Sequence, residues 1–284
     1  MTKNPLVSII IPTYNRQMYV PACLESIKNQ TYKNIQTIIV DQDSSDDTPK
    51  IAKKYGALVI KRSRPKFYSP PSKSRNMGFK ESKGEIIVHL DSDMELSPKL
   101  IEEAVNLLTT GNYGALVVHE IDKTKGFWSK CKSLERRCYW GNLNIEAARI
   151  VTRKVFKEVG GYDEGLNSGD DLNVSKRYIK KAHVGFCKNI LYHNIGDLDF
   201  MKLMLKKFNY GKTSPKYFRK TKSSPVGYFI EEYKCFAKNY LLLLRNPIVG
   251  IGMLFMKTSE ILFGFLGYTV DRYKINLNWN IYEK

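Results

Sequence analysis

Residues 85–94 read EIIVHLDSDM, in which the apolar run from Ile86 to Leu90 stops directly at Asp91 and Asp93. A short run rich in β-branched residues predicts a buried strand. Three similar runs precede it, at residues 7–11, 35–40 and 58–61, and helix-length segments separate them. This alternation predicts an α/β fold whose parallel strands are joined by right-handed helical crossovers.

Polar segments follow three of these predicted strands, at Pro12 to Asn15, Asp41 to Ser44 and Asp91 to Asp93. In open α/β sheets, ligands bind beyond the carboxyl ends of the strands. We therefore expect these three segments to meet at one ligand site.

The segments between and after these strands predict further helices, a loop and further strands. A helix is predicted after DSSDDTPK, with Ser44 or Ser45 as its cap and Gly56 as its stop. Residues 62–76 are rich in Pro, Ser and cations, which predicts an irregular loop that leads into a helix near Ser74. Ser97 and Pro98 predict the start of a helix that carries Leu100 to Leu108. Further strands are predicted within 113–120, 148–153 and 183–188, and helices within 155–161 and 172–182.

The composition changes after Asn194. Between Phe200 and Ile230 there are eight Lys or Arg residues and no Asp or Glu. We therefore place a domain boundary here, with an α/β domain over residues 1–198 and a basic and apolar helical extension over residues 199–284.

The overall charge restricts the partners. The 284 residues include 46 Lys or Arg and 28 Asp or Glu, which gives a net charge of +18. Such a charge indicates a polyanionic partner, which can be nucleic acid, anionic lipid or a phosphorylated substrate. The five cysteines are scattered without the paired spacing of zinc or redox sites, which fits a reducing cytosol. The first apolar run is too short for a signal peptide, so we do not expect export.

Asp91 and Asp93 lie one residue apart at the end of a predicted strand, so the pleat directs both side chains to one side. Two carboxylates placed in this way can hold a divalent ion together with a ligand. Hard cations such as Mg²⁺ or Mn²⁺ take oxygen ligands and bridge to phosphate oxygens. The alternative is a polar turn that caps the following helix.

Five blocks together resemble a known family. In order along the chain, they are VSIIIPTYNR, IIVDQDSSDDT, SRNMGFKESKGEIIVHLDSDM, IVTRKVFKEVGGYDEGL and GDDLNVSKR. Their order and spacing resemble the inverting family-2 glycosyltransferases of the GT-A fold, over roughly residues 5–195. The resemblance implies a Rossmann-like, mostly parallel central sheet flanked by helices, with a C-terminal helical extension. It also implies a nucleotide-diphospho-sugar donor.

The resemblance assigns roles to particular residues. It implies a nucleotide pocket lined by Pro12, Tyr14 and Asn15, a base contact from Asp41, a nucleotide or diphosphate contact from Arg75, a ribose contact from Asp91, and a metal ligand in Asp93. The chain departs from the pattern at Gln42 and Asp43, where the family usually has Asp and Gly, so the donor base stays open. The alternatives are a helix-capping role for Asp41 and a solvated loop cation for Arg75.

Asp170 and Asp171 match an acidic pair of the family whose second member acts as general base. In a single displacement the acceptor hydroxyl loses its proton as it attacks, and a positioned carboxylate contributes about a hundredfold or more. Two adjacent carboxylates also raise at least one proton affinity. The alternative is a pair of acids favoured at a helix N-terminus. His193 matches a histidine that serves as a metal ligand or contacts the diphosphate, and its alternative is a structural role.

The C-terminal extension holds two apolar blocks, residues 228–247 and 248–270, and Lys257 and Glu260 lie inside the second. A buried hairpin, with Lys257 paired to Glu260, is one interpretation. The other is a pair of helices at the bilayer interface. The preceding cations favour the second interpretation, because each contributes about 1 kcal/mol near an anionic leaflet. We expect peripheral or monotopic attachment to the cytoplasmic face of the cell membrane, and no nucleic-acid partner, because no recognised motif for one is present.

These expectations combine into a metal-assisted glycosyltransferase that acts with inversion on a saccharide or lipid-linked hydroxyl acceptor, using Mn²⁺ or Mg²⁺. One alternative is a catalytically inactive relative that binds nucleotide or glycan. A second is a polyprenyl-phosphate glycosyltransferase, which is less favoured because an ionised phosphate acceptor needs no base such as Asp171. The hypothesis requires Asp41, Asp93 and Asp171 to face a common site.

Overall fold

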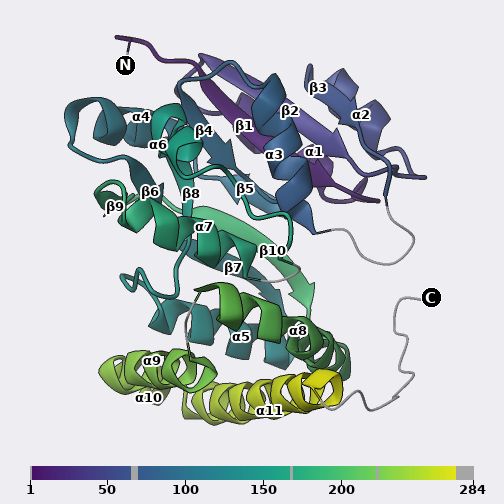
Figure 1. Cartoon of the computed structure of the whole chain (residues 1–284), viewed down its shortest axis with the longest axis vertical. Helices are drawn as coiled ribbons and strands as arrows, with labels where there is room; N and C mark the ends of the chain where they lie inside the picture. Colours follow the sequence, from purple (N-terminus) through teal and green to yellow (C-terminus); the bar gives the residue numbers. More distant parts are fainter. Residues whose placement is uncertain (1, 65–69, 167–168, 222–223, 273–284) are drawn as a thin grey trace. The chain divides into compact units, whose positions relative to one another are not determined.

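The computed structural model describes residues 2–64, 70–166, 169–221 and 224–272 (Figure 1). Its main sheet has seven strands. Their order across the sheet is β3 (Leu58–Lys61), β2 (Ile35–Asp41), β1 (Val7–Thr13), β4 (Ile86–His89), β8 (Ala148–Thr152), β6 (Ala115–Val117) and β9 (Val184–Phe186). The first four are parallel, β8 is antiparallel to both of its neighbours, and β9 is parallel to β6. The predicted mostly parallel α/β sheet is confirmed.

The apolar runs form the predicted strands because their side chains fill one core. Every residue of β1 and of β4 is buried. The helices of this part of the chain are α1 (Val20–Lys28), α2 (Thr48–Lys54), α3 (Pro71–Glu81), α4 (Leu100–Thr110), α6 (Arg153–Glu158) and α7 (Asp170–Ile179). The buried faces of α1 and α4 pack in the same hydrophobic cluster as β1 and β4.

The starts of two predicted helices differ in the structure. Helix α2 begins at Thr48 with Asp47 at its N-cap, so neither Ser44 nor Ser45 caps it, whereas Gly56 follows its end with a φ of 77° as expected. The helix predicted to begin near Ser74 is α3, which begins earlier, at Pro71, and residues 65–69 of the predicted loop lie outside the described part of the chain. A proline in the first turn suits a helix start, because its missing N–H has no intrahelical partner there.

A second sheet was not predicted. It has three strands in the order β5 (Met94–Leu96), β10 (Leu191–Asp197) and β7 (Glu120–Lys125). Strand β10 runs antiparallel to β5, with His193 opposite Met94. This pairing brings residue 193 next to the segment that follows β4, although a hundred residues of sequence separate them.

The chain forms two compact units. Unit 1 comprises Met1–Ile121, Glu146–Glu164 and Asp170–Asn194, and it contains the seven-stranded sheet. Unit 2 comprises Asp122–Ile145, Gly165–Gly169 and Ile195–Lys284, of which residues 273–284 lie outside the described residues. Its helices are α5 (Gly126–Cys138), α8 (Phe200–Thr221), α9 (Pro225–Lys238), α10 (Tyr240–Leu244) and α11 (Pro247–Arg272).

Unit 2 contains a buried ion cluster that joins four of these helices. It consists of Lys132 and Glu135 of α5, Lys207 of α8, Glu232 of α9, and Lys257 and Glu260 of α11. The Lys257 ammonium lies 2.5 Å from Glu232 and 3.2 Å from Glu135, and Lys132 lies 2.9 Å from Glu260. Lys257 and Glu260 pair at 3.8 Å, as the hairpin interpretation anticipates. Lys257 and Glu260 of α11 are therefore paired with opposite charges inside unit 2.

Candidate active site

Asp41 and Thr13 end two adjacent parallel strands. They lie opposite each other in the register of β1 and β2, and the Thr13 hydroxyl donates to Asp41 Oδ1 at 3.1 Å. Asp41 also accepts from Ser44, whose backbone N–H lies 3.0 Å from Oδ2 and whose hydroxyl lies 2.6 Å from Oδ1. The carboxylate is buried and shapes the turn after β2, so the helix-capping alternative does not describe it.

The turns after β1 and β2 are tied to each other. The Asn15 backbone N–H donates to the Ser44 hydroxyl at 2.9 Å, and Asn15 Oδ1 accepts from the Ser45 backbone N–H at 2.9 Å. Asn15 and Asp43 both have left-handed backbones, with φ of 48° and 64°. Asp43 therefore adopts a conformation that favours glycine, the residue usual at this position in the family that the sequence resembles.

The other two predicted pocket residues differ in exposure. Pro12 is buried inside β1, opposite Val40 of β2. Tyr14 is 40% exposed, and the Arg64 guanidinium lies over its ring, 3.4 Å from the centroid. Only Tyr14 of this pair thus presents a surface that a ligand can contact directly.

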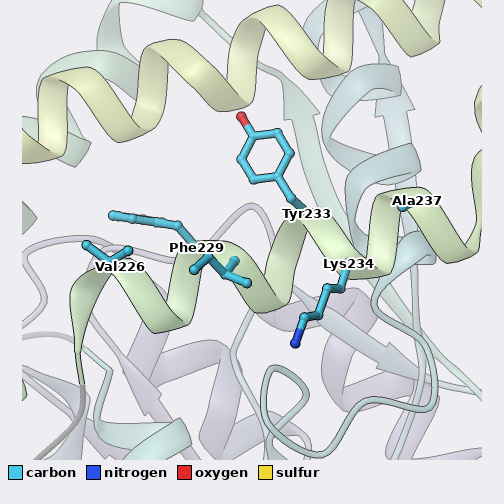
Figure 2. Close-up of a pocket in the computed structure, with 6 residues that line it drawn as sticks. Val226, Phe229, Tyr233, Lys234 and Ala237 are labelled. Carbon is cyan, nitrogen blue, oxygen red and sulfur yellow. The ribbon is translucent and has the colours of Figure 1, made fainter.

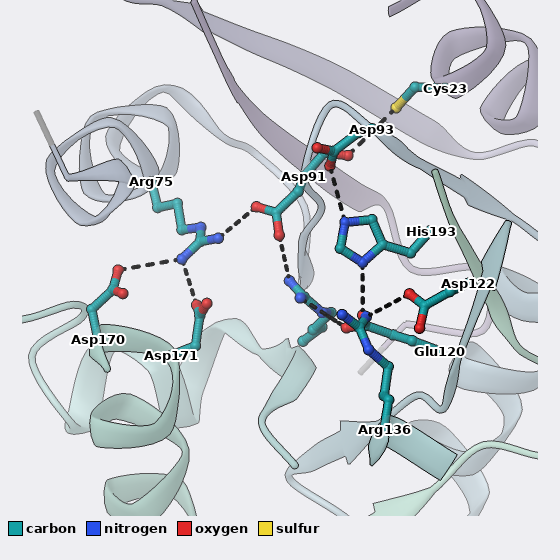
Figure 3. A network of polar contacts seen from close by, with 11 residues as sticks. Cys23, Arg75, Asp91, Asp93, Glu120, Asp122, Arg136, Asp170, Asp171 and His193 are labelled. Atoms are coloured by element: carbon teal, nitrogen blue, oxygen red, sulfur yellow. Dashed lines mark hydrogen bonds and ion pairs between the residues drawn. The ribbon is translucent and has the colours of Figure 1, made fainter. Parts of the chain in front are cut away.

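Arg75 brings together carboxylates from two distant segments (Figure 3). Its side chain is buried in α3, so the alternative of a solvated loop cation is wrong. Nη2 donates to Asp91 Oδ1 at 2.7 Å, while Nη1 donates to Asp171 Oδ1 and lies 3.4 Å from Asp170 Oδ2. Burial by itself disfavours the charged guanidinium, but Asp171 and the other neighbouring acids hold the pKa of Arg75 well above its usual value.

Asp170 and Asp171 occupy the first turn of α7. Burial, and then the charge of Asp171, raise the pKa of the Asp170 carboxyl to about 7. The side chain of Asp171 is more exposed than that of Asp170, at 32% against 10%. Asp171 is therefore the member of the pair that an acceptor can reach more easily.

The two aspartates that follow β4 have different partners. Asp91 pairs with Arg75 and also with Arg149, whose Nη1 lies 3.1 Å from Asp91 Oδ2. Burial would raise the pKa of Asp91, but Arg149 and Arg75 lower it below its ordinary value. Asp93 instead faces His193, whose Nε2 lies 3.6 Å from Asp93 Oδ1. Among the described residues, no group of three or more His, Cys, Asp or Glu side chains is arranged to hold a metal ion.

Sequence reasoning missed Arg149 and Glu120. Arg149 lies in β8, where its four neighbours along the strand are buried. A cation inside an apolar strand is a usable signal, because arginine is rarely buried in proteins unless it is paired. Glu120 is the last residue of a segment predicted to hold a strand and has no such signal, and its contact with His193 depends on the unpredicted second sheet.

Comparison with known proteins gives one family. Residues 8–161, more than half of the chain, match the model of glycosyl transferase family 2. An uncharacterized glycosyltransferase of Rickettsia typhi is 28% identical over 207 residues, which cover 67% of this chain and 64% of that protein. The chain thus spans slightly less than two thirds of the length of this relative.

Solved structures share the fold. The mannosyltransferase PcManGT from Pyrobaculum calidifontis, in complex with GDP-Man and Mn²⁺, has a TM-score of 0.63 and 16% identity, covering 96% of this chain and 89% of that one. TarS 1–349 of S. aureus, in complex with UDP, has a TM-score of 0.55 and 18% identity, covering 98% and 94%. These likenesses extend over nearly the whole chain and establish its architecture as that of the GT-A fold.

Proposed function

This chain belongs to glycosyl transferase family 2, and on that premise we propose that it transfers a glycosyl group from a nucleotide-diphospho-sugar to a hydroxyl of a saccharide or lipid-linked acceptor. The transfer is a single displacement with inversion, assisted by Mn²⁺ or Mg²⁺. Residues 1–198 form the catalytic domain in this proposal, and residues 199–284 form the extension that attaches to the membrane.

One observation carries the proposal: a single buried guanidinium, that of Arg75, contacts both Asp91 after β4 and Asp171 at the start of α7. Asp41 ends β2, and strands β2 and β4 both flank β1, so it belongs to the same edge of the sheet. A donor bound along this edge would lie between the segment that follows β4 and the acidic pair of α7. This convergence supports a site that holds donor and acceptor together.

The donor side of the proposal uses the turns after β1 and β2. Tyr14, Asn15 and Asp41 would contact the nucleoside, with Pro12 supporting them from inside β1. Asp91 would contact the ribose. The solved neighbours were captured with GDP-Man and with UDP, which supports a nucleoside diphosphate as the leaving group. Arg75, already bonded to three carboxylates, would act on the diphosphate mainly by holding those acids in place.

Asp93 and His193 would hold the divalent cation. A carboxylate oxygen and an imidazole nitrogen are ligands that suit Mn²⁺, and the two side chains face each other at 3.6 Å. When bound, the cation would neutralise the negative charge that develops on the departing diphosphate. The presence of Mn²⁺ in the PcManGT complex supports this part of the proposal.

Asp171 would take the proton from the attacking hydroxyl. Its partly exposed position at the start of α7 suits contact with an acceptor, and Asp170 beside it holds a proton more readily than a free carboxyl does. Arg75 orients the Asp171 carboxylate from the buried side. This need for a base favours a neutral hydroxyl acceptor over a polyprenyl phosphate.

Unit 2 would provide the membrane contact. Exposed apolar side chains lie on α9, α10 and α11, among them Ile230, Leu241, Ile251 and Phe255. An apolar depression of about 480 Å³ on α9 is lined by Val226, Phe229, Ile230, Tyr233, Lys234 and Ala237. Figure 2 shows these side chains along the helix. Residues Pro247–Val270 of α11 are long and apolar enough to cross a bilayer. The buried ion cluster favours an orientation along the membrane surface, because spanning would remove Lys257 and Glu260 from their partners.

The experiment is a donor screen with purified protein, in which release of nucleoside diphosphate is measured with Mn²⁺, with Mg²⁺ and with a chelator. We expect Asp93→Ala to abolish metal-dependent turnover. Asp171→Asn should retain donor binding but lose transfer by about a hundredfold or more. Asp47→Asn, at an exposed carboxylate before α2, is the matched control and should behave like wild type.

The outcomes separate the alternatives. Transfer that survives Asp171→Asn unchanged would contradict the assignment of the base and would point to an ionised phosphate acceptor. Donor binding by the wild type without hydrolysis or transfer on any acceptor would identify a catalytically inactive relative.

A further inference from the structure

Asp91 and Asp93, which both follow β4, are connected by contacts that do not involve Arg75 and that pass through Arg149, Glu120 and His193 (Figure 3 labels Glu120 and His193). Arg149 Nη1 donates to Asp91 Oδ2 at 3.1 Å, and its Nε donates to Glu120 Oε1 at 2.9 Å. The other oxygen of Glu120, Oε2, lies 3.2 Å from Nδ1 of His193. The opposite nitrogen of that imidazole, Nε2, faces Asp93. A chain of contacts therefore runs from Asp91 to Asp93 through three intermediate side chains.

These intermediate side chains are largely withdrawn from solvent. The exposed fractions are 13% for Arg149, 15% for Glu120 and 18% for His193. Arg149 Nη2 also lies 2.8 Å from Glu120 Oε1, so both Nε and Nη2 of Arg149 contact this oxygen. Because each oxygen of Glu120 has a different partner, its carboxylate is held between Arg149 and the Nδ1 side of His193.

We propose that Glu120 and Arg149 are positioning residues that hold the His193 imidazole with its proton on Nδ1 and with Nε2 turned toward Asp93. A carboxylate that accepts from one ring nitrogen fixes the tautomer and makes the other nitrogen available as a ligand. The inference rests on the proposed function for the identity of the cation. The orientation of the imidazole itself is a property of the metal-free protein.

The carboxylate can be replaced by an amide with a definite consequence. In Glu120→Gln, Arg149 still requires an oxygen at the position of Oε1, because a guanidinium only donates. The amide must then turn its NH₂ group toward His193. Since Nδ1 would have to accept that hydrogen bond, the ring proton moves to Nε2, the nitrogen that faces Asp93.

The first test is nitrogen NMR of the histidine rings in the metal-free protein, at a pH where the imidazole is neutral. The chain has four histidines, and His193→Gln identifies the signal of residue 193. We expect the Nδ1–H tautomer in wild type and the Nε2–H tautomer in Glu120→Gln. Glu146→Gln is the matched control, because Glu146 pairs with His119 Nδ1 at 2.8 Å and should change the His119 signal alone.

The second test measures binding of Mn²⁺ by electron paramagnetic resonance, with nucleoside diphosphate present. Glu120→Gln should weaken Mn²⁺ binding by about 10- to 100-fold, because a proton then occupies the nitrogen that faces the cation. Arg149→Lys should also weaken it, because a single ammonium cannot replace the two-sided contact of the guanidinium. Glu146→Gln should leave the affinity unchanged.

The results separate this inference from the proposed function. A folded Glu120→Gln protein in which His193 keeps the wild-type tautomer overturns the positioning role. An inverted tautomer, together with no Mn²⁺ binding by the wild type, upholds that role and removes the cation from the proposed function. If Glu120→Gln does not fold, Glu120→Asp replaces it, and His193 should then populate both tautomers because the shortened carboxylate withdraws from Nδ1.

Discussion

Asp170 shows at the scale of one residue how the fold changes the chemistry of a side chain. Burial, followed by the charge of Asp171, raises the pKa of Asp170 to about 7, although Arg75 opposes the shift. A folded state that holds this proton more tightly than the unfolded chain is favoured at low pH and loses that advantage as the pH rises toward 7. We therefore predict that Asp170→Asn gains stability over wild type as the pH rises from 5 to 8, by at least ~1 kcal/mol.

Thermal unfolding of both proteins across this range checks the prediction. The difference in melting temperature should grow up to about pH 7 and then level off. Asp47→Asn, with an exposed carboxylate, should show no such trend. Parallel curves for Asp170→Asn and wild type would mean that Arg75 balances the combined effect of burial and of Asp171 on the Asp170 carboxyl.

Helices α8 and α11 show at the scale of elements why glycine is required at their contact. A Cβ atom on Gly211 of α8 would lie 2.0 Å from the Gly264 carbonyl oxygen, and one on Gly267 would lie 1.9 Å from the Phe208 carbonyl oxygen. These are backbone atoms, which cannot rotate away. We predict that Gly211→Ala lowers the free energy of unfolding by ~1–3 kcal/mol, measured by chemical denaturation.

The matched control lies in another helix of unit 2. A Cβ atom on Gly227 of α9 would meet only the Ser224 Cβ, at 3.6 Å. Gly227→Ala should therefore be neutral or stabilise the protein by ~0.5–1 kcal/mol, because alanine loses less backbone entropy in a helix. A Gly211→Ala variant as stable as Gly227→Ala would show that α8 and α11 are less closely packed than these distances require.

At the scale of the whole molecule, the charge of +18 and the apolar surface of unit 2 should act together on anionic lipid. We predict co-sedimentation with vesicles of anionic phospholipid, little binding to neutral vesicles, and weaker binding as salt screens the cations. Ile251→Glu should reduce the binding, because Ile251 is 70% exposed on α11. Met18→Glu, at an apolar residue of unit 1 that is 81% exposed, should not.

The alternative at this scale is a partner copy of the chain. If the apolar surface of unit 2 mediates self-association, Ile251→Glu should lower the mass in solution and leave the binding to vesicles unchanged. Light scattering with and without vesicles separates these two outcomes.

The sequence by itself predicted strands β1 to β4 and the polar segments that follow β1, β2 and β4, because short apolar runs of neighbouring residues indicate buried strands. It also brought out Asp170 and Asp171 through the resemblance of five blocks, and it left open whether Arg75 is solvated. The pairing of β10 with β5, which places His193 beside Asp93, had no local signal.

Only the tertiary structure decided which charges meet. Arg75 and Asp171 are 96 residues apart in the chain, and Glu120 meets Arg149 across two different sheets. An ion pair depends on the distance between side chains in space, and its members carry no pattern that shows them to be partners. For that reason the acids of the proposed site and Arg75 were predicted from the sequence, whereas the carboxylate partners of Arg75 and the contacts of Arg149 and Glu120 were not.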